Sequence, residues 1–222
     1  MKLRQYTRLI LYILLVATIL FVSAGRTDWY IAWAFLGVYL AIIIIGIIYI
    51  DPDLLEERSH IGPGAKKWDI VLAISVVVFI LPLTLLVAGL DIGRYHWSPV
   101  LPVWIQIIFL LCFVIGSTIQ LWAMITNKFF STFVRIQTDR GHYVVTDGPY
   151  KYVRHPGYSA AIIVSFSIPL LLGSIWALVP AMIGDIILVI RTVLEDNTLK
   201  KELHGYDEYA SRVHYRLLPG IW

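Results

Sequence analysis

The chain of 222 residues is 59% hydrophobic and only 15% charged, and its mean hydropathy is +0.76. Soluble domains carry about 25% charged residues, so this composition excludes a soluble enzyme and indicates a membrane protein. The formal net charge of +3 is too small to point to nucleic acid as a partner. The single cysteine, Cys112, excludes both a disulfide framework and a cysteine metal site.

Four apolar runs predict membrane-spanning helices in the first part of the chain. A helix that crosses the roughly 30 Å hydrocarbon layer needs about 20 apolar residues, and residues 9–24, 29–50, 70–90 and 100–125 approach or meet this length. The first run ends in Val22-Ser23-Ala24, which imitates a signal-peptide cleavage site, but we interpret the run as an anchor.

The last apolar stretch, Tyr158 to Ile190, is too long for one crossing, because as a straight helix it would extend about 50 Å. Leu172-Gly173-Ser174 lies at its midpoint. The pattern therefore predicts a C-terminal helical hairpin of two short crossings. The expected fold class is an all-α polytopic membrane protein with five to six transmembrane helices.

The positions of the basic residues favour six crossings over five. With six, the N-terminal Lys2, Arg4 and Arg8 share one side with all other Lys and Arg except Arg26 and Arg94. Short cytoplasmic loops collect Lys and Arg. Both termini are therefore predicted to be cytoplasmic.

The tail is predicted to form an amphipathic helix on the cytoplasmic membrane surface, broken or capped at Gly205. Apolar residues recur there every three or four positions: Leu199, Leu203, Tyr206, Tyr209, Val213 and Leu217.

Two polar segments are the candidate functional regions, because ionisable groups are costly near a bilayer. They are residues 137–158 and 191–199, and six crossings put both on one face, where they can line one cavity. Arg191 and Glu195 are four residues apart on one helical face, so that they can pair with each other or point jointly at a ligand.

Each candidate also has a purely structural explanation. Arg154-His155 fits positive flanking of a helix, and the Arg191–Glu195 pair fits an ion pair at a helix end. Asp185, in the last crossing, needs a partner or a water-filled cavity, and its structural explanation is burial near Ser167 or Thr192. The neighbouring tyrosines fit an interfacial aromatic belt: Tyr143, Tyr150, Tyr152 and Tyr158.

The sequence resembles the isoprenylcysteine carboxyl methyltransferase family and, more loosely, the related phospholipid methyltransferases. The resemblance lies in residues 142–158, 191–199, 205–209 and 216–219. It divides the chain into N-terminal helices, residues 1–98, and a methyltransferase-like core, residues 100–222, within a single membrane domain.

The resemblance implies an integral membrane methyltransferase that uses S-adenosylmethionine and acts on the carboxylate of an isoprenylated cysteine. It implies that the lipophilic acceptor enters from the bilayer, with no nucleic acid or metal required, and that the active site is cytoplasmic. Arg191 would face the acceptor, and Arg191 and Glu195 would carry the catalysis. The implied cofactor-binding residues are Gln137, His142, Tyr143, Val144, Val145, Tyr150, His155, Pro156, Gly157, Tyr158 and Glu195.

Three alternatives stay open at this point. The first is N-methylation of a phospholipid amine. The second is a nicotinamide-dependent reductase, because residues 213–219 also resemble the tails of sterol reductases. The third is a noncatalytic membrane scaffold that retains the fold.

Overall fold

The computed structural model describes the backbone of residues 2–222 and the side chains of residue 7 and residues 10–222. The described part is all-helical, which confirms the all-α part of the predicted fold class. The α-helices are α1 (Lys2–Ala24), α2 (Tyr30–Tyr49), α3 (Pro52–Glu57), α4 (Lys67–Val78), α5 (Thr84–Gly89), α6 (Val103–Thr126), α7 (Pro156–Leu172), α8 (Leu178–Glu202) and α9 (Tyr206–Arg212). The π-helical turn η1 (Phe79–Leu83) joins α4 to α5, and a second, η2 (Leu90–Tyr95), continues α5, so that Lys67–Tyr95 form one rod. Two 3-10 turns are η3 (Thr138–Arg140) and η4 (Gly148–Lys151).

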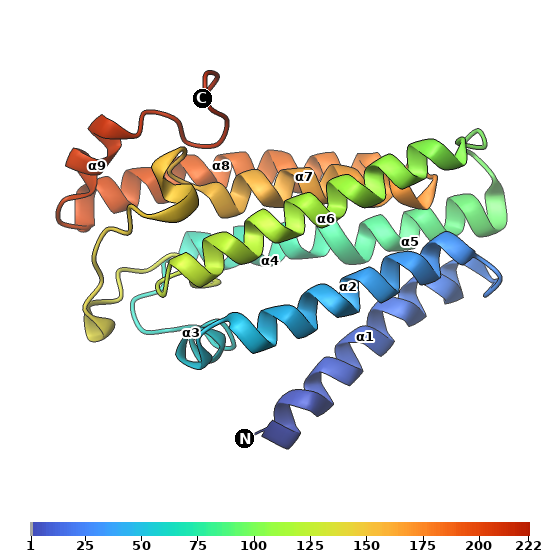
Figure 1. Cartoon of the computed structure of the whole chain (residues 1–222), viewed down its shortest axis with the longest axis horizontal. Helices are drawn as coiled ribbons and strands as arrows, with labels where there is room; N and C mark the ends of the chain where they lie inside the picture. Colours follow the sequence, from blue (N-terminus) through green and yellow to red (C-terminus); the bar gives the residue numbers. More distant parts are fainter. Residues whose placement is uncertain (1) are drawn as a thin grey trace.

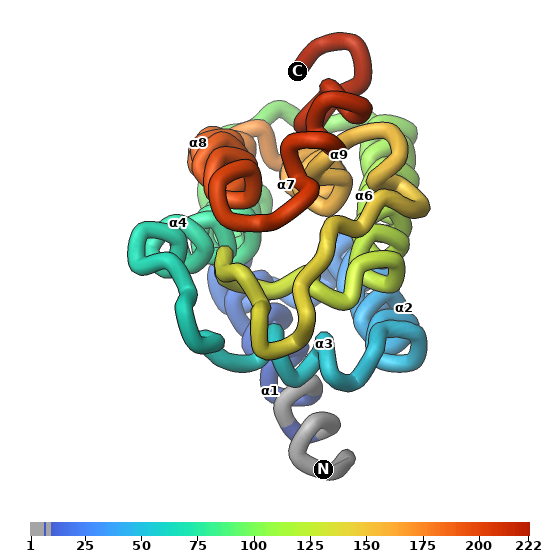
Figure 2. Tube along the Cα trace, turned by 90° about the vertical axis from the view of Figure 1, so that its left-hand side faces the viewer, coloured from blue at the N-terminus to red at the C-terminus, as the bar shows by residue number. Residues whose placement is uncertain are grey.

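The long helices run side by side and alternate in direction (Figure 1). The short connections 25–29, 96–102 and 173–177 lie at one end, here called the hairpin end. Helix α3, residues 127–155 and residues 203–222 lie at the other, the polar end. Figure 2 looks at the polar end and shows residues 127–155 running across the mouth of the bundle.

Three helical segments among the described residues are long and apolar enough to cross a membrane: Tyr30–Tyr49, Lys67–Tyr95 and Val103–Thr126. Ile10–Ala24 and Pro156–Leu172 are apolar but shorter. Large apolar side chains such as Ile48, Val71 and Leu111 stay more than half exposed on these helices. A lipid environment explains this exposure, because a soluble surface does not carry such continuous apolar area. The chain is therefore an integral membrane protein.

Asp91 ties the hairpin end together. Its carboxylate is fully buried and accepts hydrogen bonds from the backbone and hydroxyl of Ser98, at 2.8 and 2.5 Å, and from the Ser174 hydroxyl, at 2.5 Å. Ser98 precedes α6, and Ser174 lies in the predicted turn between α7 and α8, where Gly173 has φ of 88°. The predicted C-terminal hairpin is thus confirmed, and the connections 96–102 and 173–177 meet at one carboxylate of η2.

Close packing joins the neighbouring helices. Gly116 of α6 packs on Ile163 of α7, where an added Cβ would lie only 3.0 Å from that side chain. The apolar core of the bundle includes the fully buried Phe35, Phe113, Leu85 and Ile168.

Asp185 lies between α7 and α8 and has a different partner from either one expected. The Ser165 hydroxyl donates to its Oδ2 at 2.5 Å, whereas the expected neighbours Ser167 and Thr192 bond to backbone carbonyls of their own helices. The reason is helical register, since Ser165 faces α8 at this level. Oδ1 is buried without a partner in the part of the chain that the structure describes.

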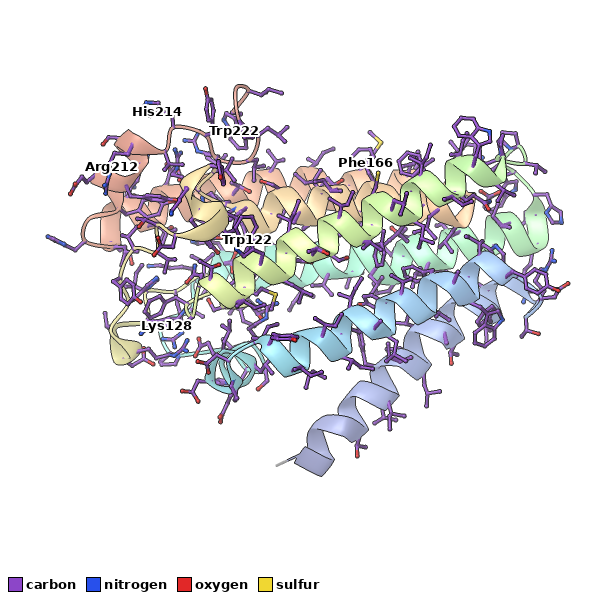
Figure 3. All side chains as sticks on the ribbon, in the orientation of Figure 1. Trp122, Lys128, Phe166, Arg212, His214 and Trp222 are labelled. Atoms are coloured by element: carbon purple, nitrogen blue, oxygen red, sulfur yellow. The ribbon has the colours of Figure 1, made fainter. Side chains whose placement is uncertain are left out.

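The tail differs from the predicted surface helix. Gly205, in the left-handed conformation with φ of 82°, separates α8 from the seven-residue α9 and confirms the expected break. The apolar face, however, packs inward: Leu203, Tyr206 and Tyr209 form a buried cluster with Tyr150. Figure 3 shows Arg212, His214 and Trp222 at the polar end and Phe166 farther along the bundle.

Candidate functional site

A cavity opens at the polar end, enclosed by residues 127–158, the C-terminal part of α8, and α9. With its open mouth counted, it contains about 780 Å³ of space not filled by atoms, within the range of small-molecule sites. Its lining is mixed, with aromatic and aliphatic walls and a few charged groups: Asn127, Phe129, Phe130, Ser131, Phe133, Val134, Arg135, His142, Tyr143, Val144, Val145, Tyr150, Arg154, His155, Gly157, Tyr158, Arg191, Glu195, Leu199, Leu203, Tyr206 and Tyr209.

The two polar segments singled out in the sequence converge on this cavity. Ten of the twelve site residues implied by the resemblance line it: His142, Tyr143, Val144, Val145, Tyr150, His155, Gly157, Tyr158, Arg191 and Glu195.

Gln137 and Pro156 are the two implied site residues that do not line the cavity. Gln137 is 0% exposed; its amide donates to the Phe129 carbonyl at 2.8 Å and accepts from Arg140 at 2.5 Å. Pro156 occupies the first position of α7, where its missing N–H costs no hydrogen bond. Both residues support the cavity wall from behind.

Tyr158 and Glu195 form the polar centre of the cavity. The Tyr158 hydroxyl donates to Glu195 Oε2 at 2.5 Å, and the His155 ring stacks on Tyr158 with centroids 5.7 Å apart. The other oxygen of Glu195, Oε1, has no hydrogen-bond partner among the described residues. Glu195 therefore presents a free carboxylate oxygen to a cationic ligand.

Arg191 pairs with Asp69, not with Glu195. Its Nε and Nη2 donate to the two oxygens of Asp69 at 2.6 and 3.0 Å, and its guanidinium lies over the Tyr158 ring, 5.3 Å from the centroid. The expected Arg191–Glu195 ion pair is absent from the described residues, because α4 packs against α8 and brings the fully buried Asp69 to Arg191.

Asp196, one residue after Glu195, points away from the cavity and holds the surrounding segments together. It is 0% exposed and accepts from Arg154 at 2.7 and 3.0 Å, from Tyr206 at 2.9 Å and from Arg216 at 3.0 Å. Arg154 also donates to the Val213 carbonyl at 2.7 Å. The tail is thus fixed to the start of α7 and to α8 through one carboxylate.

A second ion-pair network holds residues 135–142 against α3. Arg135 donates to both oxygens of the buried Glu57, at 2.7 and 2.9 Å, and to Asp139 at 2.7 Å. The Arg135 guanidinium lowers the pKa of Glu57 below its usual range. This network gives the loop below the cavity a fixed shape.

His142 is neutral at pH 7, because burial and then the charges of Arg135 and Arg140 lower its pKa to about 4. Its Nδ1 accepts from the Gln137 backbone N–H at 3.2 Å, and this bond leaves the ring proton on Nε2. The ring packs on Phe129 with centroids 4.5 Å apart.

The neutral form of His142 predicts a pH-dependent stability. Between pH 6.5 and about 4 the unfolded chain binds a proton at His142 that the folded chain does not, so its contribution is complete above pH 6.5 and falls as the pH falls. We expect the Tm of the wild type, relative to His142→Asn, to fall by about 4–8 °C between pH 7 and pH 5. Asparagine can still accept the Gln137 N–H, and a Tm difference that stays constant with pH would contradict the assignment.

Several lining residues were not foreseen from the sequence. Phe129, Phe130 and Phe133 form an aromatic wall just before the polar segment 137–158. The signal in the sequence was the cluster of three phenylalanines between Lys128 and Arg135. Asp69 was missed because it stands at the edge of an apolar run beside Lys66 and Lys67, where an acidic residue is also a common start to a helix.

Comparison with known proteins gives an independent assignment. Residues 108–201 match the model of the Isoprenylcysteine carboxyl methyltransferase (ICMT) family. A relative from Arabidopsis thaliana, Protein-S-isoprenylcysteine O-methyltransferase B, is 29% identical over 152 residues, which cover 67% of this chain and 72% of the relative. The matched region includes residues 127–158, α7 and most of α8, and therefore most of the cavity wall. Over this region the chain is similar to the isoprenylcysteine carboxyl methyltransferase family, and both matches support a methyltransferase.

Proposed function

We propose that the chain transfers a methyl group from S-adenosylmethionine to the carboxylate of an isoprenylated cysteine. The observation that carries this proposal is the presence of both charges in one cavity: a carboxylate at Glu195 and a guanidinium at Arg191, on one face of α8. The printed name of the Arabidopsis relative supports the same acceptor.

The residues of the cavity fit S-adenosylmethionine, which brings an electrophilic methyl group on a sulfonium. Glu195 Oε1 is available for its cationic end. The ring edges and aliphatic side chains of Phe129, Tyr143, Val144 and Leu199 provide apolar surface for the adenine. His155, one turn from Tyr158, lies within the same polar centre and suits the carboxylate of the methionine part.

The acceptor side needs a cation rather than a base. A carboxylate is already a nucleophile at neutral pH, whereas an ammonium acceptor must first lose a proton. Arg191 can hold a carboxylate by charge-assisted hydrogen bonds, and alignment of the acceptor with the methyl group in a site that excludes water provides much of the rate. The cavity walls from Phe130 to Val134 and from Leu203 to Tyr209 exclude water on two sides.

We also propose that the polar end is cytoplasmic and that the chain crosses the membrane six times. Among the Lys and Arg whose side chains are described, Arg26 and Arg94 lie at the hairpin end and all others lie toward the polar end. Basic residues collect on the cytoplasmic side of a membrane protein. The side chains of the N-terminal Lys2, Arg4 and Arg8 are outside the described ones. The prenyl chain of the acceptor then enters laterally from the bilayer, and its polar end reaches the cavity.

The test is transfer of label from methyl-tritiated S-adenosylmethionine by the purified protein in detergent, with an N-acetylated S-farnesylcysteine as acceptor. We expect a product that mild base hydrolyses to volatile labelled methanol, because the new bond is an ester. A parallel incubation with phospholipid vesicles should give no base-stable labelled lipid. Base-stable N-methylated lipid, or transfer to neither acceptor, would refute the proposal.

A further inference from the structure

Arg191 has only one edge left for a ligand. Its Nε and Nη2 are held by Asp69, and Nη2 also donates to the Thr132 carbonyl at 2.7 Å. Nη1 has no hydrogen-bond partner in the described part of the chain, and Arg191 lines the cavity. The Nη1 edge is therefore the part of the guanidinium that can reach a bound molecule.

Asp69 fixes this orientation and also cancels the charge. It is 0% exposed and is itself anchored by the Val134 backbone N–H, which donates to Oδ2 at 2.7 Å. The Arg191–Asp69 pair has no net charge, so by itself it would attract a carboxylate ligand only weakly. Binding an anion here calls for a second cation.

Arg58, which follows α3, is such a cation; it does not line the cavity itself but lies against Phe130 of the cavity wall. Its Nη1 donates to the Phe130 carbonyl at 3.0 Å, and its guanidinium lies over the Phe130 ring, 5.3 Å from the centroid. No carboxylate forms an ion pair with Arg58 among the residues whose side chains the structure describes. A poorly hydrated cation without a counter-ion is costly unless a ligand supplies one.

Arg58 and Arg191 lie close to each other across residues 130–132. The Thr132 hydroxyl donates to the Arg58 carbonyl at 3.0 Å, while the Thr132 carbonyl accepts from Arg191. Burial lowers the pKa of Arg58 to about 10, and the neighbouring charge of Arg191 acts in the same direction. With Asp69 included, this group keeps one unbalanced positive charge; Glu195, the other carboxylate near Arg191, is assigned above to the methyl donor.

We propose that Arg58 and Asp69 complete the acceptor subsite: Arg58 binds the acceptor carboxylate beside Arg191, and Asp69 is the positioning residue that directs the Nη1 edge of Arg191 toward it. The inference rests on the proposed function. Both residues precede residue 108, where the family match begins. The N-terminal part of the chain would therefore supply recognition of the acceptor as well as membrane anchoring.

The experiment compares an N-acetylated S-farnesylcysteine with its uncharged carboxamide, used as a competitive inhibitor. Arg58→Gln should raise the KM of the acid at least about tenfold, the usual effect of losing a charge-assisted hydrogen bond. The inhibition constant of the carboxamide and the Kd of S-adenosylmethionine should stay within about twofold, because neither depends on the anion site. General structural damage would weaken acid and carboxamide alike and would overturn the inference.

Asp69→Asn should lower kcat and leave the preference for acid over carboxamide unchanged, whereas Arg58→Gln changes that preference. The charge of Arg191 is then no longer cancelled, so the preference for acid over carboxamide should be kept, while kcat falls at least about tenfold because the guanidinium loses its fixed orientation. An unchanged kcat would overturn the positioning role. Arg26→Gln, an exposed arginine paired with Asp28 at the hairpin end, should match the wild type in every measurement.

Activity of the wild type distinguishes failure of the proposed function from failure of the acceptor subsite. No turnover of the acid by the wild type would refute the proposed function, whereas turnover with an unchanged KM in Arg58→Gln would refute only the acceptor subsite. If the Arg58→Gln variant misfolds and no longer binds the donor, the same measurements are made on the Arg58→Lys variant. The lysine variant keeps the charge and should keep the preference for acid over carboxamide, and loss of that preference in a variant that still binds the donor would overturn the inference.

Discussion

Replacement of Glu195 by glutamine should abolish binding of S-adenosylmethionine, with an increase in Kd of at least about a hundredfold, because a partly buried cation would lose its only carboxylate partner. The variant keeps the side-chain shape, and its amide oxygen can still accept the Tyr158 hydroxyl. The change therefore removes charge and little else. Isothermal titration calorimetry on the purified protein in detergent measures the effect.

Two comparisons on the same helix make the result specific. Arg191→Gln should weaken use of the acceptor more than binding of the donor, so its donor Kd should stay near that of the wild type. Glu202→Gln removes a carboxylate whose ion pair with Lys66 is partly exposed to solvent and should change neither. Equal donor affinity in the Glu195 and Arg191 variants would contradict the assignment of the two ends of the cavity.

Asp196→Asn should cause the largest loss of stability of any single substitution at the polar end. The carboxylate receives Arg154, Arg216 and Tyr206 in a fully buried position. Removal of its charge leaves two guanidinium groups without a counter-ion, a change that typically costs about 3–5 kcal/mol. We expect a lower midpoint of thermal unfolding in detergent and faster proteolytic cleavage in residues 203–222.

Asp207→Asn is the matched control, because Asp207 lies exposed on α9 and should change stability by less than about 0.5 kcal/mol. If both variants unfold at the wild-type midpoint, Asp196 does not hold the tail. If Asp196→Asn unfolds early while its tail resists protease as well as the wild type does, the network stabilises the bundle but not the cavity wall.

The positions of the long helices could be predicted from the sequence, because apolar runs and their interruptions are local features. The runs at 29–50 and 100–125 became α2 and α6 with shifts of only a few residues, and the turn at Gly173 was marked by a residue that tolerates positive φ. Convergence of residues 137–158 and 191–199 followed from alternating direction along the chain.

The partners of individual charges could not be predicted in the same way. A spacing of four residues brings Arg191 and Glu195 to one helical face, but it carries no information about α4, which contributes Asp69 from 122 positions away in the chain. The same holds for Asp185, whose partner depends on the register between α7 and α8. The spacing of apolar residues in the tail correctly predicted that one face is apolar. Periodicity alone does not distinguish a face that packs on lipid from one that packs on Tyr150.

The hydrogen bonds at Asp91 have a mechanical consequence for the whole bundle. Because Ser98 and Ser174 are both fastened to that one carboxylate, the rod that contains η2 and the C-terminal hairpin are clamped together at the hairpin end. The same rod is also fastened to α8 near the polar end, where Asp69 of α4 accepts two hydrogen bonds from Arg191. The rod and the hairpin are therefore pinned at both ends, and entry of the proposed prenyl chain between them would have to break one of these two carboxylate contacts.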